Sequence, residues 1–438
     1  MKFPDIINDA LLSRCAEQWK NDSAGHRAAS TLAHCSLHDA VLNHSLKGRL
    51  PFEFSIDLAP QGITDQGTSL RCWAFSFLNL ARWNVVQALD LQQRDFELSQ
   101  CYIYFYDQME KCRQFLQRMI RCADRPLTDP AVSSALRDPI SDYGYLSFLA
   151  LAGKYGVVPK YVMPDTYCLP DTRPVTRILS MKLRWCAREL RAMHAAGHSA
   201  GQLEQAMKDM LCDIYRILCR FLGEPPRSFT FEYRDTAGRF HRMDNLTPLE
   251  FFRRFCGIDP DDFVELSYMP GEQTPFGERY YRPEYPGAPM TEESRPTLNL
   301  CIDDIKAAVI SQLRSGEQVT FGSDVAKFSS KTLGYMAADL FLYEDFFGTP
   351  LMMHTPDSRD YRWTAGTHIM CFDGVNLRAD GTPERWKVQN SYGPDMGIEG
   401  HYVMDDSWFE PYVVSATVRR RHLPAHAQAW LEREPRPL

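Results

Sequence analysis

The sequence predicts an α+β fold in which helices dominate the first half of the chain and strands the last third. A nearly continuous apolar run follows Cys72, which is typical of a buried helix. Between Ile178 and Leu222 the apolar residues recur at a helical period. From residue 317 onward, short β-type segments follow one another and are separated by Gly and Asp.

Composition narrows the class of protein. The chain has 438 residues, of which 44% are hydrophobic and 24% charged, as expected for a globular protein with more than one lobe. Its formal net charge of −7 provides no overall attraction to nucleic acid or to an anionic membrane. The N-terminal segment lacks the apolar core of a signal peptide, and thirteen cysteines lie without the spacing of a disulfide framework. We therefore expect a cytoplasmic protein with mostly reduced, buried cysteines.

Segment boundaries follow from proline, glycine and the change of period. The stretch "HAAGHSAG" separates two amphipathic helices, "GEPP" ends the second, and Pro, Gly and Tyr crowd residues 269–296. The expected segments are an N-terminal extension (1–50), a mainly helical part with the Cys72 helix (51–160), a helical hairpin insertion (161–226), an irregular connection (227–300), a β-rich part (301–425) and a short tail (426–438).

Cys72 is the first candidate for chemistry. Most cysteines in such a chain serve only for packing, but Cys72 lies where a small polar loop turns into the apolar helix. The free N–H groups and the dipole at a helix N-terminus favour a thiolate, so we expect a lowered thiol pKa. Nucleophilic catalysis also requires a base, a group that orients the base and a donor for an oxyanion.

His368 and Asn390 are candidates for the base and its orienting group. A histidine at the start of a buried strand is more often a satisfied core residue than a catalyst. However, Asn390 ends the apolar face of the next predicted strand and needs a partner, which the imidazole would supply. Tyr392 would shield that bond from water. Gln66 lies six residues before Cys72, and its amide could serve an oxyanion together with the Cys72 backbone N–H.

A metal site is a weaker hypothesis. His34 and His38 are four residues apart and could share a helix face. They have no CxxC or HExxH companion, and ordinary surface or core histidines are the more frequent case. We expect neither a metal nor an organic cofactor.

The order of these residues resembles the papain-like cysteine peptidases. Gln66 is followed by Cys72-Trp73, then His368, then "NSYG" from Asn390. The chain resembles most closely the bleomycin hydrolase (aminopeptidase C) branch, whose insertion matches the long Cys72–His368 separation. Segments that resemble this branch recur in order: "ELSQCYIYFYDQMEKC", "KYGVVPK", "GEPPRSFTFEYRD", "TPLEFF", "GEQVTFGSDV" and "THIMCFDGV" through "DDSWFEPYVV".

The resemblance implies roles for the candidate residues. Cys72 would be the nucleophile, His368 the general base and acid, Asn390 the orienting group and Gln66 a donor in the oxyanion hole. The implied fold is papain-like, with a helical lobe packed on a β-barrel-like lobe and the site in the cleft between them. Family members are mainly cytoplasmic aminopeptidases that act on peptides and form hexamers.

Several positions depart from the family pattern around the substrate. Leu70 stands where the family has Gly, and Tyr392 replaces the Trp of "NSWG". The family's Gly-Gly pair is Tyr143-Gly144 here, preceded by Asp142. These five residues are the predicted substrate-binding positions, and the departures bear on specificity more than on the reaction.

The C-terminal end is another departure. Family members continue into an arm that enters the cleft and restricts cleavage to the N-terminal residue of the substrate. Here the sequence stops at "RPL". We expect a tail that does not reach Cys72, an open cleft and relaxed or internal cleavage, unless an acid such as Asp142 takes over the role of the arm.

Two other functions remain open on the sequence alone. One is a catalytically altered relative that acts as a scaffold or binding protein, which Leu70 mildly favours. The other is an amidase or acyltransferase that uses the same triad. Binding of nucleic acid is not expected, because "RRRH" at 419–422 is as readily a solvated strand end.

Overall fold

The computed structural model describes residues 6–58, 62–93, 95–140, 148–284, 290, 295–353 and 355–438. Within these ranges the chain forms helices and a large sheet, so the mixed helix and strand content expected from the sequence is confirmed. None of the helices described here combines the length and the apolar character needed to cross a bilayer.

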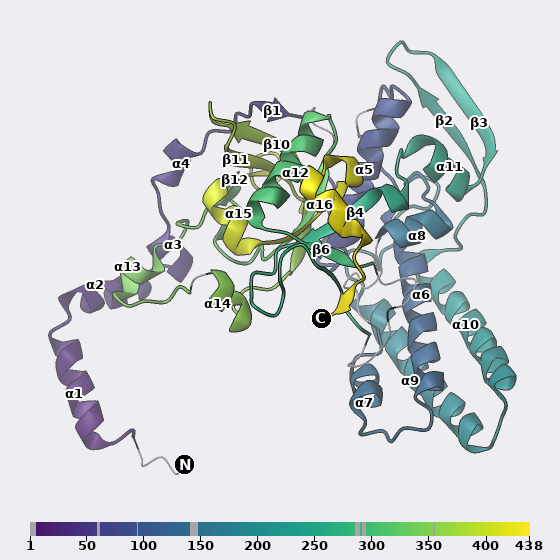
Figure 1. Ribbon diagram of the computed structural model, residues 1–438, viewed down its shortest axis with the longest axis horizontal. Coiled ribbons are helices and arrows are strands. Elements are labelled where there is room, and N and C mark those ends of the chain that lie inside the picture. The colour runs from purple at the N-terminus through teal and green to yellow at the C-terminus, as the bar shows by residue number, and fades with distance from the viewer. Residues whose placement is uncertain are drawn as a thin grey trace.

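The N-terminal part is an extended series of short helices. The first two of them extend away from the body of the molecule (Figure 1), whereas Val41 and Leu46, in the last two, are buried in the apolar cluster of the sheet. Helix α1 buries none of its residues, although it carries Leu12 and Trp19. The four helices are α1 (Asp9–Lys20), α2 (Ser23–Leu32), α3 (Leu37–Val41) and α4 (Leu46–Arg49).

Helix α5 (Cys72–Ala88) begins at the candidate thiol and lies in the middle of the molecule. It is apolar on almost every side, and thirteen of its seventeen residues are buried. Three further helices pack with it or beside it: α6 (Gln100–Arg121), α7 (Pro130–Arg137) and α8 (Phe148–Tyr155).

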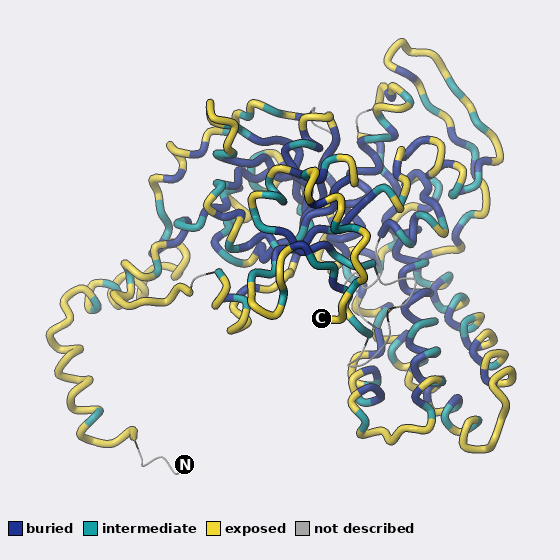
Figure 2. The backbone as a smooth tube through the Cα atoms, in the orientation of Figure 1, coloured by how far each residue is buried: buried dark blue, intermediate teal, exposed yellow. Residues whose placement is uncertain are grey.

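A long helical hairpin extends from this region. It consists of α9 (Arg173–Ala195) and α10 (Ala200–Leu222), which pack on α6 through one apolar face each. Helix α10 starts with a capping box between Ser199 and Gln202, which explains why the chain turns back into a helix there. The free end of the hairpin is exposed (Figure 2).

Most strands belong to one twelve-stranded sheet. Its order is β14-β5-β6-β4-β13-β7-β10-β11-β12-β9-β8, with β1 also paired to β10. The strands are β1 (Ile56–Asp57), β4 (Phe263–Ser267), β5 (Arg279–Tyr281), β6 (Thr297–Asn299), β7 (Val319–Ser323), β8 (Ser329–Ser330), β9 (Tyr335–Met336), β10 (His368–Leu377), β11 (Pro383–Gln389), β12 (His401–Asp405), β13 (Val413–Arg419) and β14 (Arg436–Pro437).

Residues 227–300 are more regular than the sequence led us to expect. They contain a separate hairpin, β2 (Phe229–Arg234) with β3 (Phe240–Leu246), helix α11 (Pro248–Phe255) and three strands of the main sheet. Helix α11 is fixed by a capping box between Thr247 and Glu250, with Pro248 in its first turn. Proline and glycine in this stretch mark the turns between short elements. The expectation of one continuous irregular connection is therefore corrected.

The remaining helices are α12 (Ile302–Arg314), α13 (Tyr343–Phe347), α14 (Thr355–Asp360), α15 (Asp406–Tyr412) and α16 (Ala425–Gln428), with 3-10 turns η1 (Pro260–Asp262), η2 (Arg420–His422) and η3 (Ala429–Glu432). Of these helices, α12 and α15 pack on the sheet, and α13 lies beside α2.

The buried side chains form two large apolar clusters. One joins α5 to α11 and the helical hairpin, and the other joins the sheet to α12 and α15. Helix α5 also packs against β10, where the Ser76 hydroxyl donates a 2.7 Å hydrogen bond to the carbonyl of Ile369. This contact brings the helix that starts at Cys72 against the strand that starts at His368.

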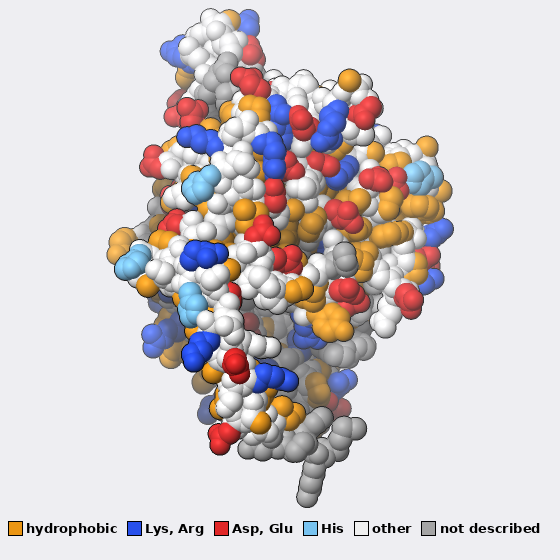
Figure 3. Space-filling model, turned by 90° about the vertical axis from the view of Figure 1, so that its left-hand side faces the viewer, with side chains coloured by type: hydrophobic (Ala, Val, Ile, Leu, Met, Phe, Trp, Pro, Cys, Tyr) orange, Lys and Arg blue, Asp and Glu red, His pale blue; other side chains and the backbone are white. Residues whose placement is uncertain are grey.

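Acidic and basic side chains are interspersed on the face that carries the N-terminal helices (Figure 3). This face therefore presents no continuous basic surface of the kind that binds nucleic acid.

Candidate active site

Cys72 is a buried residue, 9% exposed, at the first position of α5. Burial raises the pKa of its thiol, whereas hydrogen bonds from the backbone N–H groups of Ile369, Trp73 and Cys72 itself lower it. Burial is the largest of these effects, so the resting thiol favours its protonated form. We expected the helix N-terminus to lower this pKa. The helix N–H groups act in that direction, but they do not overcome desolvation.

His368 is fixed by the pairing of two antiparallel strands. It opens β10, and Asn390 directly follows β11. The register Cys371↔Gln389 brings the start of β10 beside the end of β11. As a result His368 Nε2 lies 2.9 Å from Asn390 Oδ1, and both residues are buried.

The hydrogen bonds of Asn390 define the orientation of the imidazole. Asn390 Oδ1 also accepts a 2.7 Å hydrogen bond from the backbone N–H of Ser391, which identifies this atom as the oxygen. Because an amide oxygen only accepts, Nε2 of His368 carries a proton and donates it. The other ring nitrogen, Nδ1, is therefore the atom that can take up a proton when the ring is neutral.

Aromatic packing encloses the histidine. The ring of Tyr392 stacks on His368 with 5.0 Å between centroids and 10° between planes. The ammonium group of Lys331 lies 4.0 Å from the centroid of the Tyr392 ring. Burial lowers the pKa of His368 to about 4, the Asn390 hydrogen bond opposes this shift, and the charge of Lys331 adds to it. The resting imidazole is therefore neutral at physiological pH.

Cys72 and His368 lie in the same small region. The backbone of Ile369, the residue after His368, lies near enough to the Cys72 sulfur to lower the pKa of its thiol. Tyr392, which stacks on His368, also senses the charge of Cys72, and this charge contributes to the raised pKa of its phenol.

Gln66 joins the loop before α5 to the end of β11. Its backbone N–H donates to the carbonyl of Ser391 at 2.9 Å, and its Oε1 accepts from the Ser391 hydroxyl at 2.7 Å. Its Nε2 donates to the carbonyl of Ser69 at 2.6 Å. A primary amide has two N–H donors, and this bond uses one of them.

The predicted substrate-binding residues are only partly described. Leu70, two residues before the thiol, is 44% exposed and presents its side chain to solvent. Tyr392 lies against the histidine. Asp142, Tyr143 and Gly144 fall in residues 141–147, which lie outside the described residues.

Two residues that the sequence reasoning missed take part in this network. Ser391 bonds to both Asn390 and Gln66 and so connects the two sides of the site. Its place after Asn390 in "NSYG" was the available signal. Lys331 packs on Tyr392 from a distant loop, and nothing in the local sequence indicated this contact.

Metal binding finds no support in the described part of the chain, where no group of three or more His, Cys, Asp or Glu side chains is arranged to hold an ion. His38 instead packs against Phe341, with 4.9 Å between ring centroids.

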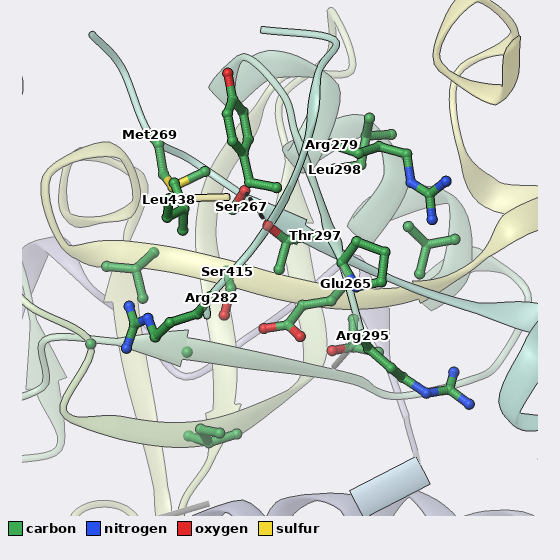
Figure 4. A pocket seen from close by; sticks show the side chains of 18 of the residues that line it. Glu265, Ser267, Met269, Arg279, Arg282, Arg295, Thr297, Leu298, Ser415 and Leu438 are labelled. Carbon is green, nitrogen blue, oxygen red and sulfur yellow. Dashed lines mark hydrogen bonds between the residues drawn. The ribbon is translucent and has the colours of Figure 1, made fainter. Parts of the chain in front are cut away.

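A cavity of about 740 Å³ adjoins the site. Trp73 and Ile369, the residues that follow Cys72 and His368, contribute to its lining. Leu438 also lines it, since β14 pairs with β5 and the Leu438 N–H donates to the carbonyl of Tyr281 at 3.0 Å (Figure 4). We expected a tail too short to approach the cleft. It runs beside β5 and places its last residue at this cavity instead.

Comparisons with known proteins find relatives along nearly the whole chain. The model of the Peptidase C1-like family matches residues 6–438. Aminopeptidase C of Lactobacillus helveticus is 34% identical over 425 residues, covering 96% of this chain and 93% of the relative. Aminopeptidase G of Lactobacillus delbrueckii subsp. lactis is 33% identical, covering 97% and 96%.

A solved structure extends the likeness to the whole fold. The crystal structure of PepW from Lactobacillus rhamnosis HN001 matches with a TM-score of 0.92 at 32% identity, covering 98% of this chain and 97% of that chain. The chain therefore belongs to the Peptidase C1-like family and, within it, to the bleomycin hydrolase and aminopeptidase C branch of the cysteine peptidases.

Proposed function

We propose that the protein hydrolyses peptide bonds through Cys72, His368 and Asn390, with aminopeptidase-type action. The observation that carries this proposal is the buried 2.9 Å bond between His368 and Asn390, next to a thiol at the start of a helix. It leaves Nδ1 of the neutral imidazole as the acceptor for the thiol proton.

The proposed reaction starts from a neutral thiol and a neutral imidazole. As the sulfur attacks the substrate carbonyl, its proton passes to His368 Nδ1, and Asn390 holds the resulting imidazolium through Nε2. The second N–H of Gln66 and the Cys72 backbone N–H stabilise the oxyanion. His368 then protonates the leaving amine, and water releases the acyl group from the sulfur with the same histidine as base.

Substitution of the thiol tests this proposal. Cys72→Ala should abolish peptide hydrolysis and capture of an E-64-type inhibitor, while Cys212→Ala, at an exposed cysteine of α10, should leave both intact. Wild-type turnover by Cys72→Ala would refute the assignment. Failure of wild-type protein to take up the inhibitor would favour a scaffold or binding protein.

Specificity requires a separate experiment. The expectation of relaxed or internal cleavage assumed that the tail stays away from the cleft, whereas Leu438 lines the adjoining cavity. We therefore propose preferential release of N-terminal residues. Peptides with free and acetylated N-termini, analysed by mass spectrometry, distinguish the two modes. An amine added to the same assay tests for acyl transfer, because a transferase would join the acyl group to that amine and give a product that mass spectrometry detects.

We also propose that the two apolar clusters correspond to the helical and β-barrel-like lobes of a papain-like fold. The protein should act in the cytoplasm as a homo-oligomer, with a hexamer as the assembly implied by the resemblance. Helix α1 supports self-association, because it exposes Trp19 and buries no residue of its own. Light scattering that gave a 50.4 kDa monomer over a wide concentration range would refute this.

A further inference from the structure

The lining of the cavity next to Cys72 is suited to distinguishing substrates by the charge of their side chains. It is bordered by α5 and by strands of the sheet, and Trp73 and Ile369 connect it to the thiol and the imidazole. Its volume of about 740 Å³ lies within the range of small-molecule and peptide sites. A substrate bound at Cys72 can therefore extend into it on one side of the bond that is cleaved.

Arginine side chains outnumber acidic side chains in this lining. Of the described residues that form the cavity, six are arginines and four are carboxylates. Figure 4 shows several of them around the same space. The arginines are Arg121, Arg279, Arg282, Arg295, Arg359 and Arg420, and the acids are Asp261, Glu265, Glu284 and Asp360.

Two of the acids are already matched by arginines. Glu284 lies 2.7 Å from Arg121, and Asp261 lies 3.7 Å from Arg295. These pairs leave little net charge at their end of the cavity.

Other arginines bind neutral groups. Arg279 donates to the carbonyls of Leu431 and Arg433 at 2.7 and 3.0 Å, and Arg359 donates to that of Val413 at 3.2 Å. A carbonyl fixes a guanidinium in position without neutralising it, so these positive charges act on whatever enters the cavity.

Glu265 and Arg282 carry opposite charges that act on each other in this cavity. Glu265 projects from β4, and burial raises the pKa of its carboxyl while Arg282 and Arg295 lower it. Its carboxyl makes no hydrogen bond or ion pair with a described residue, although its backbone pairs with β13. Arg282 is exposed and makes neither a hydrogen bond nor an ion pair with any described residue. Its guanidinium can therefore form a two-pronged bond with a ligand carboxylate.

We propose that this cavity is a substrate subsite that prefers an acidic side chain on the acyl side of the cleaved bond. Arg282 is a specificity-determining residue of this subsite, and the negative charge of Glu265 opposes its effect. The proposal rests on peptide hydrolysis at Cys72. An aspartate or glutamate would pair with a guanidinium there, whereas a lysine would meet like charges.

Fluorogenic aminoacyl and dipeptidyl amides that carry Asp, Asn or Lys at one position test this. The value of kcat/KM should fall in the order Asp, Asn, Lys. Arg282→Gln should lower the Asp-to-Asn ratio by about twofold to fivefold, as expected for one partly solvated ion pair. Glu265→Gln should raise that ratio. Arg188→Gln, an exposed arginine of α9 far along the hairpin, should leave it unchanged.

A preference for Lys, or an Asp-to-Asn ratio that neither Arg282→Gln nor Glu265→Gln alters, would overturn the proposal. Turnover of the Asn substrate separates this failure from a failure of the active site. Calorimetric titration of Cys72→Ala with Asp amide and Lys amide, each with a free amino group, measures binding in the cavity without turnover. Tighter binding of the Asp amide supports the subsite, and equal or tighter binding of the Lys amide refutes it.

Discussion

Two buried histidines on neighbouring parts of one sheet have different surroundings. His368 and His401 are each 5% exposed. His368 has a neutral amide at Nε2, and none of the hydrogen bonds found among the described residues engages its Nδ1. His401 has the Asp373 carboxylate 3.1 Å from Nε2 and the Glu399 carbonyl 3.1 Å from Nδ1.

The difference lies in which histidine keeps a ring nitrogen without a hydrogen-bond partner among the described residues. Both nitrogens of His401 face oxygen acceptors of the protein, and its carboxylate partner is itself buried. Such a ring links β12 to β10 across the intervening β11 and has no nitrogen left for substrate. An amide partner orients His368 without adding charge, and Nδ1 remains for the thiol. Burial alone does not distinguish a catalytic histidine from a structural one, whereas the partners of both nitrogens do.

The largest expected effect tests this contrast directly. His368→Ala should lower kcat/KM by about 10⁴-fold or more, since the thiol loses its base. The fraction of His401→Gln protein that folds should retain most of the wild-type activity. Asn390→Ala should fall between them, because an orienting group assists the base without replacing it. Steady-state kinetics on one peptide amide provides the comparison, and a His401→Gln defect equal to that of His368→Ala would contradict it.

We expect His401 and its partner to matter more for the stability of the fold than for activity. Asp373→Ala removes the acceptor beside His401 Nε2 and should cost about 1–3 kcal/mol of unfolding free energy, as expected when a buried donor loses its partner. Asp373→Asn keeps a hydrogen-bond acceptor and should recover part of that loss. Urea denaturation followed by circular dichroism measures both variants. A cost below 1 kcal/mol for Asp373→Ala would show that the pair is not structural.

Gln66 belongs to the catalytic side of the comparison through its bonds to Ser391. Gln66→Ala should lower kcat with little change in KM, because its free N–H serves only the oxyanion. Loss of one such donor typically costs about 2.7–4 kcal/mol of transition-state stabilisation. A rise in KM at constant kcat would instead assign Gln66 to ground-state binding.

The smallest expected effect is a change in the stability of the fold with pH. Burial lowers the pKa of His368 from 6.5 to about 4, so between these values the unfolded chain binds a proton that the folded protein does not. Stability should therefore fall as pH drops from about 6.5 toward 4, by at most about 3 kcal/mol from this residue. His368→Gln should remove that part of the pH dependence. Urea midpoints at pH 7 and pH 4.5 for both proteins measure it.

The arrangement around His368 was more accessible to sequence reasoning than that around His401. Asn390 ends an apolar strand face, and an unpaired buried amide implies a partner on the adjacent strand. His401 lies in "GHYVMDD", where nothing distinguishes it from an ordinary strand residue. Its partner Asp373 is 28 positions away on β10, and only the register of the sheet brings the two together.

The sequence by itself determined the mixed fold class, the family, and the identity and order of Gln66, Cys72, His368 and Asn390. The fold class follows from local period and strand alternation, which are properties of neighbouring residues, whereas the family and the roles of these four residues come from the resemblance of ordered motifs along the chain. Only the tertiary structure decided the raised pKa of Cys72, the strands within 227–300, the place of Leu438 and the arginines around one cavity. Desolvation and charge clustering depend on segments that are distant in the chain, so they become defined only when the chain has packed.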